Sequence, residues 1–486
     1  MTLRPVLSSL VAVVAASGGA GCSRECCTVD GFPILMERAP LGATLPGAEP
    51  AGGLLARATS ASIEGGKSFS MVVDTGSPVT AFDGPVSRTL VSRTFQLHEA
   101  TGDATAVTPL RADFQQINTI QLPLGPVGDS SIKPLGVLGG DLLRGYSVEM
   151  RLGGPCPPGA APTAASPAPV CPSMTFWKHQ GGNDGFFQDA GYAVLRFAAY
   201  GGGEINVQGD RDLFGLRAPV SVPPTRIVVR TCAAPEAFTP AVKPTSCCNP
   251  REEVMIATGA NLSLVLATGI GPIVLSQSAW RRVAAQLDGQ PAMLDAPLVI
   301  ATWPTEIPAV WTTVPRVALV NLEAGINDPG PCAELARSRR LEWVANQQEM
   351  NSDVAACAES CDIDPREKDK AQNSAAYIEI GGRVPIAIIN DNEPLLQGIR
   401  VDVRPEGPEI DGLLGAAGLG LGRLEIDYRN NPTRLILSCE KDAARDRCWT
   451  AARCPRLPDH DHKHLCFGLR AHPLPQTCAP SGCPVQ

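Results

Sequence analysis

Apolar and polar residues alternate along many short stretches of the chain, which is the pattern of a β-strand with one buried face. In the clearest stretch, Phe69, Met71 and Val73 alternate with Ser68, Ser70 and Val72. The runs on either side of Gly381 and Gly382 predict a β-hairpin. Apolar runs bounded by turn residues predict further strands at 94–97, 116–122, 147–152, 193–197, 262–266, 297–302, 314–322, 376–380, 384–389 and 433–437.

Few segments have the periodicity of a helix. The segment 278–287 has it, and Ser276 or Ser278 can cap its first turn. A second helix is predicted over roughly 333–349, where three apolar residues form a thin stripe. The pattern as a whole therefore predicts a mainly β protein with a few short helices.

One group of elements occurs twice in the same order. An apolar strand leads into Asp74-Thr75-Gly76, and a second one leads into Ala267-Thr268-Gly269. Each is followed later by two apolar residues and a glycine, at Val137-Leu138-Gly139 and at Leu413-Leu414-Gly415, and then by another strand. The sequence therefore predicts a duplicated unit. The earlier copy of Ala-Thr-Gly, at 257–259, lacks the apolar patch and helix that follow Ala267.

Composition agrees with strands and loops and excludes some partners. The 486 residues include 45 prolines and 48 glycines but only 5% aromatic residues. The formal net charge is -8 and no basic run occurs, so the chain has no electrostatic footprint for nucleic acid or an anionic membrane surface.

The N-terminus has the form of a targeting segment. Arg4 precedes a short apolar run at 6–16, and small residues lead to Cys22. Gly19-Ala20-Gly21-Cys22 resembles a bacterial lipobox, in which Cys22 would be lipidated after cleavage; the alternative is an ordinary secretory signal. We expect export to the cell envelope, as an outer-membrane lipoprotein, or secretion. The 17 cysteines fit an oxidising compartment, and their pairing cannot be deduced from sequence.

Asp74-Thr75-Gly76-Ser77 and the duplicated turns resemble the signature of the pepsin-like aspartic peptidases. The resemblance implies a bilobal pepsin-like acid-protease fold with two pseudo-symmetric β-rich lobes. It divides the chain into a signal peptide at 1–22, a tether and irregular leading segment at 23–55, an N-terminal lobe at 56–215 with an insertion at 153–190, a C-terminal lobe at 216–440 with a cysteine-framed insertion at 332–361, and a cysteine-rich tail at 441–486.

The family's chemistry needs two carboxylates about 3 Å apart that share one proton, one acting as base and the other as acid. By resemblance Asp74 is the first, and Ala267 stands at the second position, where a methyl group can do no acid–base work. Asp141 and Asp411 flank the turns, and the resemblance places both away from the cleft.

The resemblance also assigns the four residues that follow the two catalytic positions. It implies that Thr75, Gly76, Thr268 and Gly269 interlock the two loops. Residues 83–133 contain no tyrosine, although the family carries one over its cleft.

Histidine and aspartate alternate in the tail. His460, His462 and His464 are candidate zinc or copper ligands, but we favour a solvated loop. No cofactor is expected.

Three functions remain open from sequence. We favour a non-proteolytic pepsin-like protein, exported and monomeric, whose cleft holds an extended peptide or protein ligand. The alternatives are an atypical active aspartic endopeptidase that pairs Asp74 with another group, and a surface structural protein.

Overall fold

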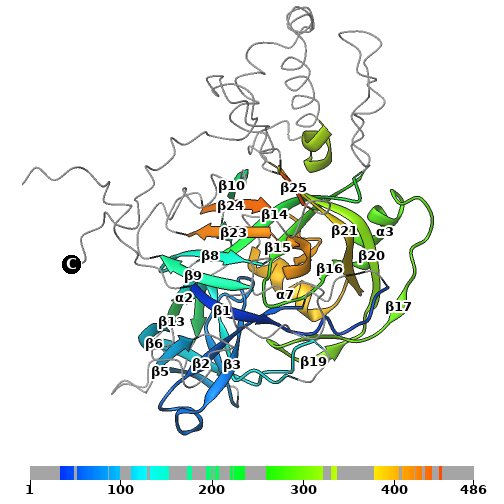
Figure 1. Ribbon diagram of the computed structural model, residues 1–486. Coiled ribbons are helices and arrows are strands. Elements are labelled where there is room, and N and C mark those ends of the chain that lie inside the picture. Colours follow the sequence, from blue (N-terminus) through cyan, green and yellow to red (C-terminus); the bar gives the residue numbers. More distant parts are fainter. Residues whose placement is uncertain are drawn as a thin grey trace, which may run out of the picture. The chain divides into compact units, whose positions relative to one another are not determined.

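The fold comes from a computed structural model of the chain, in which strands predominate (Figure 1). All residues described below lie within one unit, Asp30–His472. The structure describes residues 33–46, 48, 52–85, 87–98, 111–128, 132–152, 172–177, 193–197, 199–200, 203–206, 219–222, 224–235, 259–320, 330–336, 377–403, 408–420, 422–428, 433–439 and 448–450.

The largest sheet has twelve strands and combines early and late parts of the chain. Its order is β10 (Ala193–Phe197), β24 (Thr433–Cys439), β23 (Gly422–Asp427), β8 (Ser147–Arg151), β9 (Ser173–Trp177), β1 (Pro33–Arg38), β2 (Leu54–Thr59), β3 (Ser68–Val73), β7 (Gly136–Leu138), β4 (Ala81–Asp83), β6 (Arg111–Leu122) and β5 (Ser87–His98).

A nine-stranded sheet is formed by the later part of the chain. Its order is β11 (Ala199–Tyr200), β14 (Arg226–Ala233), β15 (Ala260–Leu266), β22 (Gly412–Leu414), β16 (Ile273–Ser276), β21 (Tyr377–Ile389), β20 (Val310–Val320) and β17 (Leu294–Asp295), with β25 (Cys448–Thr450) also pairing with β21.

Short elements complete the described fold. The two-stranded sheets are β12 (Gly203–Asn206) with β13 (Pro219–Val222), and β18 (Leu298–Ile300) with β19 (Trp303–Ile307). The named helices are η1 (Glu64–Gly66), α2 (Gly140–Leu143), α3 (Gln277–Ala284), α7 (Pro394–Val403) and η4 (Ala416–Leu419), and residues 331–336 are also helical.

The same strand order occurs in both large sheets. In the first sheet it reads β2-β3-β7-β4-β6-β5, and in the second it reads β14-β15-β22-β16-β21-β20. Corresponding pairs also agree in direction: β3–β7 and β15–β22 are parallel, and β4–β7 and β16–β22 are antiparallel. We call β3, β4 and β7 the first unit, and β15, β16 and β22 the second unit. Each unit presents one Thr-Gly loop at the end of its first strand.

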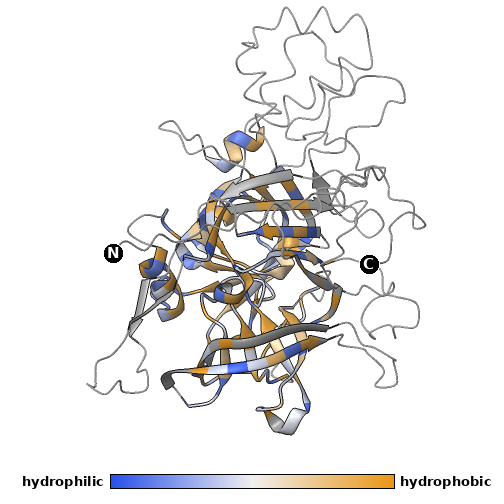
Figure 2. Ribbon diagram, turned by 90° about the vertical axis from the view of Figure 1, so that its left-hand side faces the viewer, coloured by the Kyte–Doolittle hydropathy of each residue, from blue (hydrophilic) through white to orange (hydrophobic). Residues whose placement is uncertain are grey.

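Hydrophobic residues lie along the strands that pack inside the molecule (Figure 2). The helix α3 begins after Ser276, whose hydroxyl accepts a hydrogen bond from Ala279 N at 3.2 Å. Its buried residues Ala279, Trp280 and Val283 lie on one face, and they pack into the core cluster that also holds the strand residues around Leu264. The short helical pattern at this position is therefore explained by one cap and one apolar face.

The predicted hairpin at Gly381 and Gly382 is wrong, because β21 runs through both glycines as one strand. Both parts of β21 pair with the same neighbour, β20. The register shifts between Val314 and Arg316 of β20, opposite this point, and Gly382 has φ of 90°. The glycine pair therefore permits an irregularity within a long strand, where a turn was expected.

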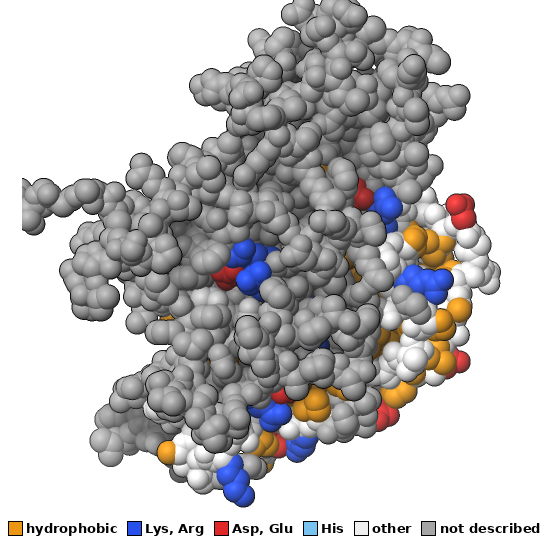
Figure 3. All heavy atoms as spheres, in the orientation of Figure 1, with side chains coloured by type: hydrophobic (Ala, Val, Ile, Leu, Met, Phe, Trp, Pro, Cys, Tyr) orange, Lys and Arg blue, Asp and Glu red, His pale blue; other side chains and the backbone are white. Residues whose placement is uncertain are grey.

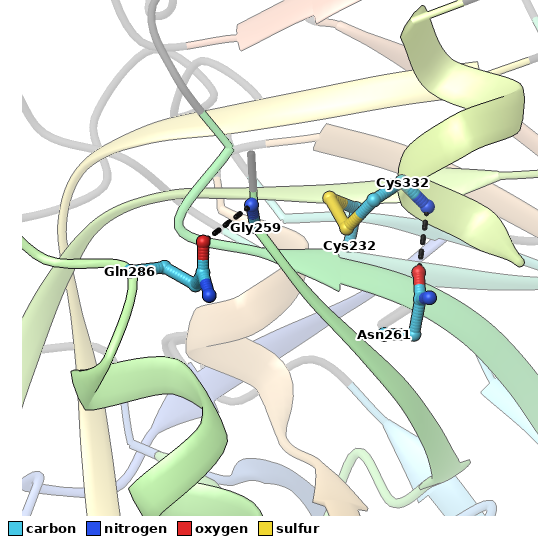
Figure 4. The surroundings of a disulfide bond; sticks show 5 residues. All are labelled: Cys232, Gly259, Asn261, Gln286 and Cys332. Carbon is cyan, nitrogen blue, oxygen red and sulfur yellow. Dashed lines mark hydrogen bonds between the residues drawn. A yellow bond between two sulfur atoms is a disulfide. The ribbon is translucent and has the colours of Figure 1, made fainter. Parts of the chain in front are cut away.

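Cys232 of β14 and Cys332 form a disulfide, a pairing that sequence could not select (Figure 4). The Cys332 N–H donates to Asn261 Oδ1 at 2.8 Å, beside the bond. Gly259 leaves no room here, since an added Cβ would lie 2.7 Å from Cys232 Sγ. The disulfide thus joins β14 to the helical residues 331–336. Cys361 and the rest of the predicted insertion at 332–361 lie outside the described residues, apart from its first few.

Within the predicted insertion at 153–190, residues Ser173–Trp177 form β9, which pairs with β8 and β1.

None of the helices among the described residues is long and apolar enough to cross a membrane.

Candidate functional site

Two loops meet where the first strand of each unit ends. β3 ends at Val73, immediately before Asp74, and β15 ends at Leu266, immediately before Ala267. The backbone of each loop is held by the apolar turn of its own unit: Asp74 N donates to Leu138 O at 3.1 Å, and Ala267 N donates to Leu414 O at 2.9 Å. The two positions therefore have equivalent backbone settings but different side chains.

Four hydrogen bonds join the two loops through their threonines. Thr75 Oγ1 donates to Leu266 O at 3.0 Å, and Thr268 Oγ1 donates to Val73 O at 2.8 Å. Each hydroxyl also accepts from the opposite threonine N–H, at 3.2 Å for Thr75 N and 3.3 Å for Thr268 N. Both threonines are fully buried. Each loop thus fixes the backbone of the other in a water-free setting, where such bonds are strongest.

Two glycines allow the loops to come this close. A Cβ added at Gly269 would lie 2.6 Å from Asp74 Cβ, and one added at Gly76 would lie 2.7 Å from Ala267 Cβ. The Ala267 methyl group therefore faces the loop that carries Asp74. The structure brings together the five sequence-predicted loop residues and the alanine at the second position.

Asp74 is only 4% exposed, and its carboxylate is held by backbone donors. Gly76 N donates to Asp74 Oδ1 at 2.9 Å, and Gly269 N of the opposite loop donates to the same oxygen at 3.4 Å. Burial raises the pKa of Asp74, while these backbone donors and the charge of Arg226 lower it by smaller amounts, so the net shift is upward.

Arg226 is a site residue that sequence reasoning missed. β14 pairs with β15, and the pair closest to the start of β14 is Val228 with Val265, so Arg226 at the start of β14 lies at the end of the pair from which the Ala267 loop leaves. The guanidinium is buried, and its Nη2 forms an ion pair with Asp402 Oδ2 of α7 at 2.7 Å.

The electrostatic partner of Asp74 is thus a cation. Burial lowers the pKa of Arg226, and the charges of Asp402 and Asp74 oppose that shift. A second carboxylate beside Asp74 would have the opposite effect on the Asp74 pKa and raise it further. The charge arrangement at this site therefore differs in sign from a carboxylate pair.

Several buried polar atoms beside the loops have no hydrogen-bond partner among the described residues. They are Arg226 Nε and Nη1, Thr225 Oγ1 and Tyr428 Oη. Burial raises the pKa of Tyr428, and the charge of Asp74 adds to this shift, so the phenol stays protonated as a donor. Buried donors of this kind bind water or ligand oxygens when space allows.

Asp141 and Asp411, the two aspartates that flank the apolar turns, are hydrogen-bonded to other groups. Asp141 accepts from Thr80 Oγ1 and from Leu142 N, both at 2.7 Å. Asp411 accepts from Ser263 N at 2.9 Å and forms an ion pair with Arg282.

The remaining sequence-predicted sites, Cys22 and the tail residues His460, His462 and His464, lie outside the described residues. Within the described part of the chain, no group of His, Cys, Asp and Glu is arranged to hold a metal ion.

We predict that Asp74→Asn raises the midpoint of thermal unfolding at pH 7. Folding raises the pKa of Asp74 above the ordinary value of 3.8, so the protonated carboxyl group contributes stability at low pH, and that stability is lost as pH rises through the folded-state pKa. The neutral amide of asparagine does not ionise and avoids this loss of stability. The difference in unfolding midpoint between the variant and wild type should therefore vanish near pH 3. Unfolding curves from pH 3 to 7 check it, with the exposed Asp288→Asn as the matched control. A variant less stable than wild type at pH 7 would contradict the argument.

Comparison with known proteins finds likeness in structure but not in sequence family. No protein-family model matches the chain, and no curated protein matches it. The chain is similar in structure to the aspartic proteinase from Irpex lacteus, with 11% sequence identity and a TM-score of 0.33. The match covers 85% of this chain and 99% of that one.

Proposed function

We propose that the protein is a divergent member of the pepsin-like aspartic peptidase family, with the family's two β-rich lobes, that has no proteolytic activity. Support for the fold comes from the repeated strand order in the two sheets and from the reciprocal threonine hydrogen bonds between the two loops. Thr268 and Gly269 are present and make these contacts, so the bonds that hold the two loops together do not need a carboxylate at position 267.

One observation carries the non-proteolytic part of the proposal: the position in the second loop that is equivalent to Asp74 holds Ala267, with a methyl group and no carboxylate, and the cation that acts on Asp74 is Arg226. Hydrolysis by a carboxylate pair needs one ionised member that takes a proton from water and one protonated member that donates to the scissile carbonyl. A guanidinium stays protonated at every relevant pH, so it cannot alternate between these roles. Asp74 alone supplies one half of the cycle.

We propose that the site binds an extended peptide or protein segment. The unpartnered donors of Arg226 and Tyr428 suit carbonyl oxygens of a backbone, and the apolar residues Ala267 and Ile270 suit uncharged side chains. A guanidinium also forms strong hydrogen bonds with a carboxylate, so a peptide with an acidic group near Arg226 should bind more tightly.

The experiment is calorimetric titration with pepstatin, an extended apolar peptide. We expect saturable binding that Asp74→Asn changes by less than about twofold, because backbone contacts dominate. Absence of binding to wild type and to the double variant Leu41→Ser, Leu45→Ser, which removes two leucines from the apolar cluster around Ala267, would contradict the peptide-binding proposal and favour a structural role.

We also propose export, with lipidation of Cys22 as the anchor. Support comes from the signal-like N-terminus and from the disulfide at Cys232 and Cys332, which needs an oxidising compartment. Metabolic labelling with a radioactive fatty acid tests lipidation, with Cys22→Ser as the control: label lost in this variant supports it, and label absent from wild type contradicts it.

A further inference from the structure

The connection between β1 and β2 is much longer than its geometry requires. Arg38 of β1 pairs directly with Leu54 of β2, so the chain leaves and returns at the same point. A turn of two to five residues, roughly, would close such a pair. Here the chain makes an excursion through residues 39–53. We name its described first part, residues 39–46, the clasp.

The clasp begins on the first unit. Ala39 lies in a buried cluster with Val72 and Val137, which belong to β3 and β7. The carbonyl of Pro40 sits directly over Gly128, where an added Cβ would lie 2.1 Å from Pro40 O. This end of the clasp is therefore packed tightly, by backbone as well as side chain.

The clasp ends on the second sheet. Leu41 and Leu45 are each only 8% exposed, and they belong to the apolar cluster that also contains Trp311, Ala267 and Ile270. Beyond them, Arg383 Nη1 of β21 donates to Pro46 O at 2.6 Å. In Figure 1 the dark blue chain after β1 runs toward β17 and β20. One segment thus packs against the first unit and against the nine-stranded sheet.

The same excursion is tied to the second Thr-Gly loop where it returns. Leu54 N donates to Thr268 O at 3.0 Å, and an added Cβ at Gly53 would lie 2.1 Å from Gly269 O. The β1–β2 connection therefore contains both Gly53, which contacts the second Thr-Gly loop, and the clasp leucines, which belong to the apolar cluster. The second loop, whose Gly269 N–H donates to Asp74, thus contacts the same connection that contains the clasp.

Open space lies beside the clasp. An open pocket of about 1180 Å³ is lined by residues that include Thr44, Leu45 and Pro46 of the clasp and also Met293 and Leu294. Met293 and Leu294 are exposed apolar residues, and Figure 3 shows apolar side chains gathered on the surface in the region of β17 and β19. Leu45 of the clasp borders this pocket, so its side chain has open space beside it when it leaves the apolar cluster.

We propose that residues 39–46 act as an internal clasp that covers the apolar face leading to Ala267 and restricts access to Asp74. This inference rests on the proposed function, because it treats that face as the place where an extended peptide binds. The clasp and the peptide would then compete for the same apolar surface, and the 4% exposure of Asp74 describes the closed state.

Hydrogen–deuterium exchange of the full chain tests the clasp directly. The double variant Leu41→Ser, Leu45→Ser should speed exchange of the amides at 75–77 and 268–270 by about tenfold, because the cover over both loops is lost. A milder variant, Arg383→Gly, removes only the hydrogen bond to Pro46 and suits the positive φ of 52° at this position. It should raise exchange at the same amides by about threefold.

Val283→Ala is the matched control, because it truncates a buried side chain in α3 that belongs to a different apolar cluster. Equal acceleration at 75–77 and 268–270 in this control and in the clasp variants would overturn the clasp.

Pepstatin titration of the same variants separates the clasp from the proposed function. We expect the double variant to bind about tenfold more tightly than wild type. Faster exchange without binding in any variant supports the clasp and contradicts peptide binding. Unchanged exchange together with binding to wild type contradicts the clasp and leaves peptide binding standing.

Discussion

Replacing Gly269 with alanine is expected to lower the free energy of unfolding by about 3 kcal/mol. The added methyl group would lie 2.6 Å from Asp74 Cβ and 2.7 Å from Val72 Cγ1, and both neighbours are buried on well-packed backbone. The loops must separate to admit it, which stretches the reciprocal bonds between Thr75 and Thr268. Urea unfolding monitored by tryptophan fluorescence measures the change.

Gly398→Ala is the matched control for this substitution. Gly398 lies inside α7, and an added Cβ there meets nothing within 4 Å. Alanine in a helix interior is more favourable than glycine, so this variant should gain about 0.5–1 kcal/mol. If Gly269→Ala is as stable as wild type, the two loops do not approach as closely as described.

Removing the disulfide is expected to have an effect of similar size. The bond joins Cys232 and Cys332 across a sequence separation of 100. Cross-linking a loop of that length restricts the unfolded chain, and its loss costs about 4 kcal/mol in the chain-entropy account. Both cysteines are buried, so the variant Cys232→Ala, Cys332→Ala avoids leaving thiols in the core.

The disulfide prediction is measured by thermal unfolding under non-reducing conditions. Each single alanine variant should lose nearly as much as the double one, because either change breaks the bond. A double variant within about 1 kcal/mol of wild type would show that the bond adds little.

Much of the fold could be predicted from the sequence, because alternating patterns report one-sided burial directly. The strand before Asp74 and the strand before Ala267 both follow from such patterns, and the structure is mainly β as expected. The error at Gly381 has a physical reason: a glycine pair permits a turn or an irregular strand equally, and the neighbouring strand β20 decides between them.

The surroundings of Asp74 could be predicted only in part. The alanine at position 267 is visible in the sequence, but Arg226 is not distinguishable there from Arg230 four residues later in the same strand. Arg226 is distinguished by its burial and by its ion pair with Asp402, which lies far along the chain in α7. Residues 39–46 have neither a helical nor an alternating pattern of apolar residues, so the sequence could not predict that the clasp contacts two sheets.

The central proposal is that Asp74 has no carboxylate partner among the residues that the structure describes, and that the protein therefore does not hydrolyse peptides by the two-carboxylate route. The most direct test incubates the purified protein with acid-denatured haemoglobin from pH 3 to pH 6, alongside Asp74→Asn and with or without pepstatin. We predict that wild type releases no more peptide than Asp74→Asn at any pH. Cleavage that pepstatin blocks and Asp74→Asn abolishes would contradict the account.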